Sequence, residues 1–135
     1  MPNETTMPPS VQQPQFANGK ICYIEIPATD AQQSANFYHR AFGWSLRTHE
    51  DGSLSFDDTV GQVSGMFVLG RKAAAEAGLI VSIMVANAAA TCEVIVAAGG
   101  TIVKPIDPAA AEITAWFRDL GGNVMGIYEQ RGLAA

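Results

Sequence analysis

The sequence is poor in the residues that nucleic-acid binding and disulfide cross-linking require. It has 8 Lys and Arg residues against 13 Asp and Glu residues, and its formal net charge is −5. Phosphate binding needs clustered basic side chains, but Arg71–Lys72 is the only adjacent basic pair. Cys22 and Cys92 stand in apolar runs outside any CxxC pair, which predicts two buried thiols in a reducing compartment. The composition argues against a nucleic-acid partner.

Long apolar runs are also missing from the chain. No stretch reaches the ~18 residues that a membrane-spanning helix needs. The N-terminus has no basic segment followed by an apolar core, so no signal peptide is expected. We therefore expect a cytoplasmic protein without a membrane partner. The chain also lacks GxSxG, P-loop, HExxH and GxGxxG motifs, so nothing indicates hydrolase, nucleotide-phosphate or dinucleotide chemistry.

The first 18 residues differ in composition from the rest of the chain. They are rich in Pro, Gln, Ser and Thr, and the prolines at positions 2, 8, 9 and 14 disfavour a helix there. We divide the chain into an N-terminal arm, residues 1–18, and one compact domain, residues 19–130. Hydrophobic residues make up 48% of the whole chain, which is ordinary for a protein with a globular core.

Residues 19–71 show the element order β-α-β-β-β. Asp30 stands before an apolar helical stripe with Gln33 three residues on, the spacing of a capping box, and Gly43 can end that helix in a left-handed conformation. Asp51-Gly52 is a hairpin signal. From β-branched and aromatic content and from alternation we predict four strands, at residues 21–26, 44–50, 54–57 and 63–69.

The same order returns in residues 78–130. Asn87 is a second predicted helix N-cap, and the helix should stop at Gly99-Gly100. We predict further strands at residues 79–85, 101–104, 112–118 and 123–129. An offset of 57 residues aligns three landmarks of the two halves, Asp30 with Asn87, Gly43 with Gly100, and Gly65 with Gly122. This agreement indicates an internal duplication.

A duplicated βαβββ unit suggests a cup. One unit leaves one face of its sheet uncovered, and two units side by side can curve their strands around a concave cavity. We therefore predict an α+β fold in which two tandem βαβββ modules, residues 19–71 and 78–130, form a curved eight-stranded open-barrel sheet with the helices outside.

Alternation along the first strand places its side chains relative to this cavity. Cys22, Ile24 and Ile26 share one face, which is uniformly apolar and should meet the helices. Tyr23 and Glu25 share the opposite face. By elimination, Tyr23 and Glu25 should look into the cup.

Two segments carry a family resemblance. Residues 23–30 (YIEIPATD) followed by residues 36–44 (NFYHRAFGW) resemble the opening of the vicinal oxygen chelate superfamily, the glyoxalase/bleomycin-resistance/dioxygenase proteins. Residues 117–128 (FRDLGGNVMGIY) resemble its closing turn and last strand, with Asp119 matching and Leu120 in place of the usual Pro. The resemblance covers about residues 20–130 and implies the duplicated fold, while one fold hosts many chemistries.

The same resemblance identifies where a metal would be bound. Enzymes of the superfamily hold a divalent metal with His and Glu from four strands, and the matching positions here are Tyr23, Leu69, Ile80 and Gly126. No His, Asp, Glu or Cys occurs between Val60 and Gly70. A single tyrosine does not make a metal site. We therefore predict a protein without a metal or other cofactor.

Glu25 is the one strand carboxylate expected to face the cavity. It can act as a general base or as an anchor for a cationic ligand, or it can pair with an arginine such as Arg118. Gly126 in place of a family Glu should leave the pocket larger and more apolar. The full set of predicted ligand-binding residues is Tyr23, Glu25, Phe67, Ile80, Ser82, Trp116, Val124, Gly126 and Tyr128.

Three functions fit these observations. The first is a metal-free binding protein that holds a small organic molecule in its cup, as the drug-sequestering branch of the superfamily does. The second is an enzyme, either metal-free with Glu25 as the candidate catalytic base or with a metal site at other residues, and the resemblance implies a lyase, isomerase or dioxygenase reaction. The third is a structural or regulatory subunit. Because members of the superfamily often dimerise, we also expect a homodimer, with residues 1–18 as a plausible clasp.

Overall fold

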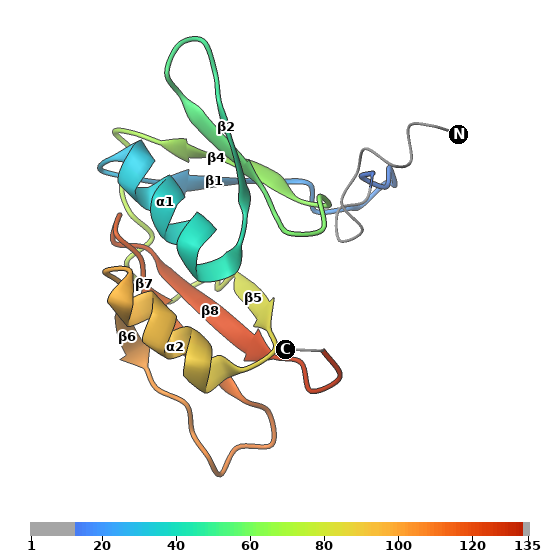
Figure 1. The fold of residues 1–135 in the computed structure, drawn as a ribbon, viewed down its shortest axis with the longest axis vertical. Coiled ribbons are helices and arrows are strands. Elements are labelled where there is room, and N and C mark those ends of the chain that lie inside the picture. Colours follow the sequence, from blue (N-terminus) through green and yellow to red (C-terminus); the bar gives the residue numbers. More distant parts are fainter. Residues whose placement is uncertain (1–12, 134–135) are drawn as a thin grey trace.

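The structure is a computed structural model that describes residues 13–133. It contains two four-stranded sheets and two helices (Figure 1). The first half of the chain forms β1 (Tyr23–Pro27), α1 (Ala31–Phe42), β2 (Ser45–Thr48), β3 (Leu54–Asp57) and β4 (Ser64–Val68). The second half forms β5 (Ser82–Val85), α2 (Ala88–Ala97), β6 (Thr101–Lys104), β7 (Thr114–Arg118) and β8 (Val124–Glu129).

Both halves have the same topology. The first sheet has the order β1-β4-β3-β2 and the second has the order β5-β8-β7-β6. In each sheet the first strand pairs in parallel with the last, and the other pairs are antiparallel. The predicted α+β fold of two βαβββ modules is thereby confirmed. The eight strands are divided between two separate sheets rather than forming one continuous ladder.

The helix ends follow the capping signals in the sequence. The carboxylate of Asp30 accepts a hydrogen bond from the backbone N–H of Gln33 at 3.0 Å, and Gly43 closes α1 with φ of 76°. The side chain of Asn87 accepts from the N–H of Ala90 at 3.0 Å in the same way. These caps satisfy N–H groups that the first turn of a helix leaves without a partner.

An aromatic core fills the space between the first sheet and its helix. Tyr38 of α1 stacks on Trp44 with ring centroids 4.7 Å apart, and Trp44 stacks on Phe56 at 4.5 Å. Phe37 of α1 also packs against Phe117 of β7, at 5.9 Å. The two modules therefore share one core instead of folding around two separate ones.

Polar contacts join the modules at the same place. Tyr38 donates its hydroxyl to Asp119 at 2.7 Å, and Asn123 donates its side-chain N–H to the carbonyl of Pro27 at 2.7 Å. Asp119 and Asn123 are both buried, in the turn between β7 and β8. Within residues 13–133, no helix has the length and apolar character needed to cross a membrane.

The offset between the modules changes along the chain. Glu25 lies opposite Met66 in the first sheet, and Ser82 lies opposite Gly126 in the second. The offset is therefore 57 residues between the first strands (82 − 25) but 60 between the last strands (126 − 66). The connection between β6 and β7 is longer than the one between β2 and β3, which accounts for the change. The predicted match of Leu69 with Gly126 is wrong, and Met66 is the equivalent residue.

Candidate functional site

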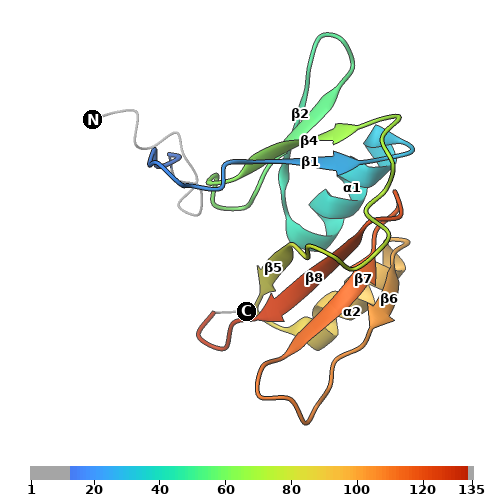
Figure 2. The same ribbon diagram turned by 180° about the vertical axis from the view of Figure 1, so that it is seen from behind.

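Each sheet keeps one face free of helices. α1 contacts β2, β3 and β4, and α2 contacts β6, β7 and β8. Seen from behind, the strands of both sheets lie in front of the two helices, so their helix-free faces open on that side (Figure 2). Most of the predicted binding residues lie on these two faces.

The first strand presents Tyr23 and Glu25 away from the core. Ile26 is buried against the helix, whereas Tyr23 is 50% exposed and Glu25 is exposed. This is the placement that alternation predicted. Cys22, in contrast, was expected to be buried and is exposed, because it precedes the first residue of β1 and alternation no longer applies to it.

Phe67 does not line this face, and its assignment to the cavity wall is wrong. It pairs with Ile26 in the register of β1 and β4, and both side chains point to the helix side. Phe67 is 3% exposed, with its ring 5.8 Å from that of Tyr38 and 5.2 Å from that of Phe56. The sequence interpretation took its aromatic character as a cavity signal, but the strand register assigns it to the core.

The second sheet brings the other predicted residues together. Ser82 is opposite Gly126, and Gly126 is opposite Trp116 on the next strand. Val124 and Tyr128 lie two residues to either side of Gly126 and so share its face. Lys104 of β6 places its ammonium 4.6 Å from the centre of the Trp116 ring, a cation–π contact.

Gly126 leaves no extra room on this face, contrary to the expectation from its sequence. A Cβ atom at Gly126 would lie 2.9 Å from Ser82 Oγ and 3.0 Å from Ile80 Cγ2. The side chains of Ile80 and Ser82 pack against Gly126 and occupy the space that a larger side chain would need. The pocket is therefore not enlarged here, and Ile80 and Ser82 form the surface in its place.

Glu25 has an arginine partner, but not the one suggested by the sequence. Its carboxylate accepts from the guanidinium of Arg71, in the segment after β4, and about half of each side chain is exposed. The sequence interpretation named Arg118 as an example of such a partner. Because one carboxylate oxygen is already engaged, Glu25 is less available as a base or as an anchor for a cation.

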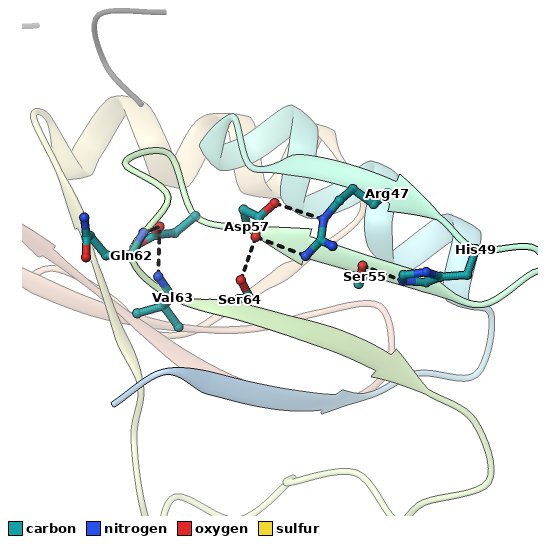
Figure 3. Close-up of polar contacts among 8 residues, drawn as sticks. Arg47, His49, Ser55, Asp57, Gln62, Val63 and Ser64 are labelled. Atoms are coloured by element: carbon teal, nitrogen blue, oxygen red, sulfur yellow. Dashed lines mark hydrogen bonds and ion pairs between the residues drawn. The ribbon is translucent and has the colours of Figure 1, made fainter. Parts of the chain in front are cut away.

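A polar ladder that the sequence analysis missed crosses the first sheet (Figure 3). Arg47 of β2 donates two hydrogen bonds to Asp57 of β3, both at 3.1 Å, and Ser64 of β4 donates to the same carboxylate at 2.6 Å. His49 and Ser55 form a second contact at 2.8 Å. Arg47, Ser55, Asp57 and Ser64 occupy alternate strand positions on the helix-free face, and His49 directly follows β2. The period-two placement of polar residues in β2 and β3 was the available signal.

The residues present do not fit a divalent metal. The four positions that correspond to family ligands hold Tyr23, Met66, Ile80 and Gly126, and only Tyr23 has an oxygen to offer. Zinc, iron and magnesium sites need several His, Cys, Asp or Glu donors. Within residues 13–133, no three such residues are grouped to bind a metal ion.

Comparison with known proteins identifies the family. The Glyoxalase/Bleomycin resistance protein/Dioxygenase superfamily model matches residues 20–127, and the chain belongs to that superfamily. A "Glyoxylase-like domain-containing protein" of Didymella fabae is 43% identical over 37 residues, 27% of this chain. That match spans 29% of the curated relative's length.

Solved structures share the fold at low sequence identity. A hypothetical protein from S. aureus superposes with a TM-score of 0.67 and 16% identity, over 86% of this chain and 97% of that one. TnmS3, an antibiotic binding protein from Streptomyces sp. CB03234, superposes with a TM-score of 0.63 and 18% identity, over 85% of this chain and 98% of that one. At these identities the likeness shows the fold alone.

Proposed function

We propose that this protein is a metal-free binder of a small organic molecule, held against the helix-free faces of its two sheets. The observation that carries the proposal is that both faces present large side chains to solvent. Tyr23 is 50% exposed and Met84 is 58% exposed. Uncovered aromatic and apolar side chains grouped on one surface are typical of a ligand or partner site.

The two faces differ in chemistry, and this difference narrows the chemical class of ligand that can contact both. The first is polar, with Tyr23 and the ladder of Arg47, Asp57 and Ser64. The second offers the Trp116 ring beside Ile80 and Gly126. A molecule that contacts both faces needs an apolar, preferably aromatic, body and polar substituents. TnmS3, which shares the fold, is an antibiotic binding protein, and this is consistent with such a ligand.

We also propose a cytoplasmic homodimer in which the cup lies between copies of the chain. The cavity that contains Tyr23 is lined by the arm and the first module, with no residue of the second. A second copy can bring its second module to that face. The clasp assigned to residues 1–18 falls partly on residues 1–12, which lie outside the described residues. Light scattering should give the mass of a dimer at micromolar concentration, and a monomer would contradict this assembly.

The two alternatives have less support. An enzyme with Glu25 as its general base requires a free carboxylate, and Arg71 occupies one oxygen of Glu25. A purely structural subunit gives no reason for the exposed side chains of Tyr23 and Met84 on the helix-free faces. Neither alternative requires a nucleic acid or a membrane as partner, which agrees with the net charge of −5.

Calorimetric titration with three naphthalene probes tests the proposal. The probes are 1-naphthamide, 1-naphthoate and 1-naphthylmethylammonium, which share a ring and differ in charge. We expect saturable binding of at least one probe and a loss of about tenfold in affinity for Trp116→Leu, since a stacked ring contributes about 1–1.5 kcal/mol. Val96→Ser, on the exposed side of α2, is the matched control and should bind like the wild type. Absence of binding by all three probes, or equal binding by Trp116→Leu, would refute the proposal.

A further inference from the structure

A cavity of about 920 Å³ lies between the N-terminal arm and the first sheet. Arm residues 14–18 line one side of it, and Tyr23, Arg47 and Ser64 of the helix-free face line the other. The cavity therefore joins the polar ladder to a segment that precedes the first strand. Its size is sufficient for a drug-sized organic molecule.

One glutamine side chain fixes the arm in place over this cavity. Gln62 accepts a hydrogen bond from the N–H of Gln15 at 3.0 Å and donates one to the carbonyl of Gln13 at 3.1 Å. Gln62 is itself held by Asp58, whose carboxylate accepts the N–H groups of Gln62 at 2.8 Å and Val63 at 3.2 Å. The arm is thus positioned by a defined turn of the first module.

The charged side chains on the described wall of the cavity are both cations. Arg47 is paired with Asp57. Lys20 donates to neutral oxygens, the carbonyl of Gln15 at 2.9 Å and Oε1 of Gln62 at 3.3 Å. Among the described residues, Lys20 therefore has no carboxylate partner. The chain as a whole has a net charge of −5, but this wall is locally positive and therefore favours an anionic ligand.

Phe16 adds an apolar surface to the same cavity. It lines the cavity but is 93% exposed, so its ring gains little from burial in this state. Tyr23, half-exposed, lines the same cavity from the first strand. A planar ring bound between Phe16 and Tyr23 would cover both aromatic side chains at once.

We propose that this cavity binds an aromatic carboxylate, with its carboxylate toward Lys20 and Arg47 and its ring between Phe16 and Tyr23. The inference rests on the proposed function and narrows its ligand class to organic anions. It reverses the expectation of a cationic ligand for Glu25, since Arg71 already neutralises that carboxylate. The arm then acts as part of the binding site rather than only as a contact between subunits.

Calorimetry with the isosteric pair 1-naphthoate and 1-naphthamide tests the charge preference. The wild type should bind the carboxylate about tenfold more tightly, as expected for one charge-assisted hydrogen bond. Lys20→Gln should remove this preference, and Lys20→Arg should keep it. Lys72→Gln makes the same charge change at a residue outside the cavity wall and should leave the preference intact. Phe16→Ala should weaken both probes by a similar factor.

The outcomes separate this inference from the proposed function. Equal affinity of the wild type for the two probes, or equal effects of Lys20→Gln and Lys72→Gln, would overturn the anion site while leaving a small-molecule binder in place. Loss of the preference for 1-naphthoate in Lys20→Gln, but not in Lys72→Gln, supports the anion site. If none of the three naphthalene probes binds, both proposals fail together.

Discussion

The hydroxyl of Tyr38 in α1 donates to the carboxylate of Asp119 in the β7–β8 turn at 2.7 Å, and both residues are buried. This contact links the first helix of one module to the last hairpin of the other. Asp119 also accepts from the N–H groups of Gly121 at 3.0 Å and Asn123 at 2.8 Å. The pair therefore holds together the junction on which the relative position of the two sheets depends.

Removing the hydroxyl should destabilise the protein. Tyr38→Phe leaves a buried carboxylate with one donor fewer, and we expect a loss of about 1.5–3 kcal/mol in the free energy of unfolding. Tyr128→Phe is the control, because the Tyr128 hydroxyl makes only an exposed contact of 3.3 Å with Glu112. Urea unfolding measures the free energy of unfolding of both variants. Equal stabilities of the two variants would contradict the importance of the Tyr38–Asp119 contact.

The same pair predicts a fall in stability at alkaline pH. Burial, followed by the charge of Asp119 and its hydrogen bond, raises the pKa of Tyr38 well above the ordinary value. The folded state therefore keeps a proton that an unfolded tyrosine loses above about pH 10. Stability should be unaffected by this group below about pH 10 and should decrease as pH rises further. Thermal melts between pH 9 and 11.5 should show a shallower decrease for Tyr38→Phe.

Gly65 should not tolerate any side chain. It is buried in β4, opposite Phe56, and a Cβ atom there would lie 2.1 Å from the carbonyl oxygen of Ile24 and 2.3 Å from the Phe56 ring. Gly65→Ala should cost about 3 kcal/mol or more, because backbone and an aromatic ring must both shift. Gly78→Ala, with open space around it, should change stability by less than about 0.5 kcal/mol. A folded, equally stable Gly65→Ala protein would show that this strand pairing is incorrect.

Glu25 should matter little for stability. Its ion pair with Arg71 is about half-exposed, and such pairs contribute less than about 1 kcal/mol. The free energy of unfolding of Glu25→Gln should therefore lie within about 1 kcal/mol of that of the wild type. Because Arg71 already pairs with Glu25, we expect Glu25→Gln to bind 1-naphthylmethylammonium as tightly as the wild type. A loss of about 1.5–3 kcal/mol of binding free energy would instead support the cationic ligand that the sequence interpretation proposed. Unchanged affinity for that probe would remove Glu25 from the site.

Purification without chelator should yield protein with no stoichiometric Zn, Fe, Ni or Mn. Tyr23, Met66, Ile80 and Gly126 occupy the family's ligand positions and do not provide the donors that these metals need. Elemental analysis measures the metal content per chain. About one metal per chain, removable with loss of ligand binding, would contradict the prediction.

Local sequence signals predicted the elements well because short-range chemistry determines them. Asp30 and Asn87 cap their helices through side chains that reach N–H groups three residues on. Alternation in the first strand placed Tyr23 and Glu25 away from the core because neighbouring side chains of a strand point to opposite faces. The resemblance of residues 20–130 to one superfamily supplied the topology, which local patterns alone leave open.

The tertiary structure decided the remaining points, because each depends on residues distant in sequence. Strand register placed Phe67 in the core and replaced Leu69 by Met66 as the equivalent of Gly126. Packing of Ile80 and Ser82 over Gly126 filled space that the sequence had left open.

The charged residues also show which points the sequence predicts and which only the folded chain determines. Glu25 was identified from its strand position, but only the folded chain brings Arg71 to it from 46 residues away. Lys20 and Arg47 likewise line one cavity only because the folded chain brings the segment before β1 and strand β2 to the same site. The sequence by itself determined the elements, the faces of the first strand and the superfamily, since these follow from short-range periodicity and matching motifs. Only the tertiary structure decided which charges of residues 13–133 are paired with one another, because ion pairing depends on distances that chain separation does not specify.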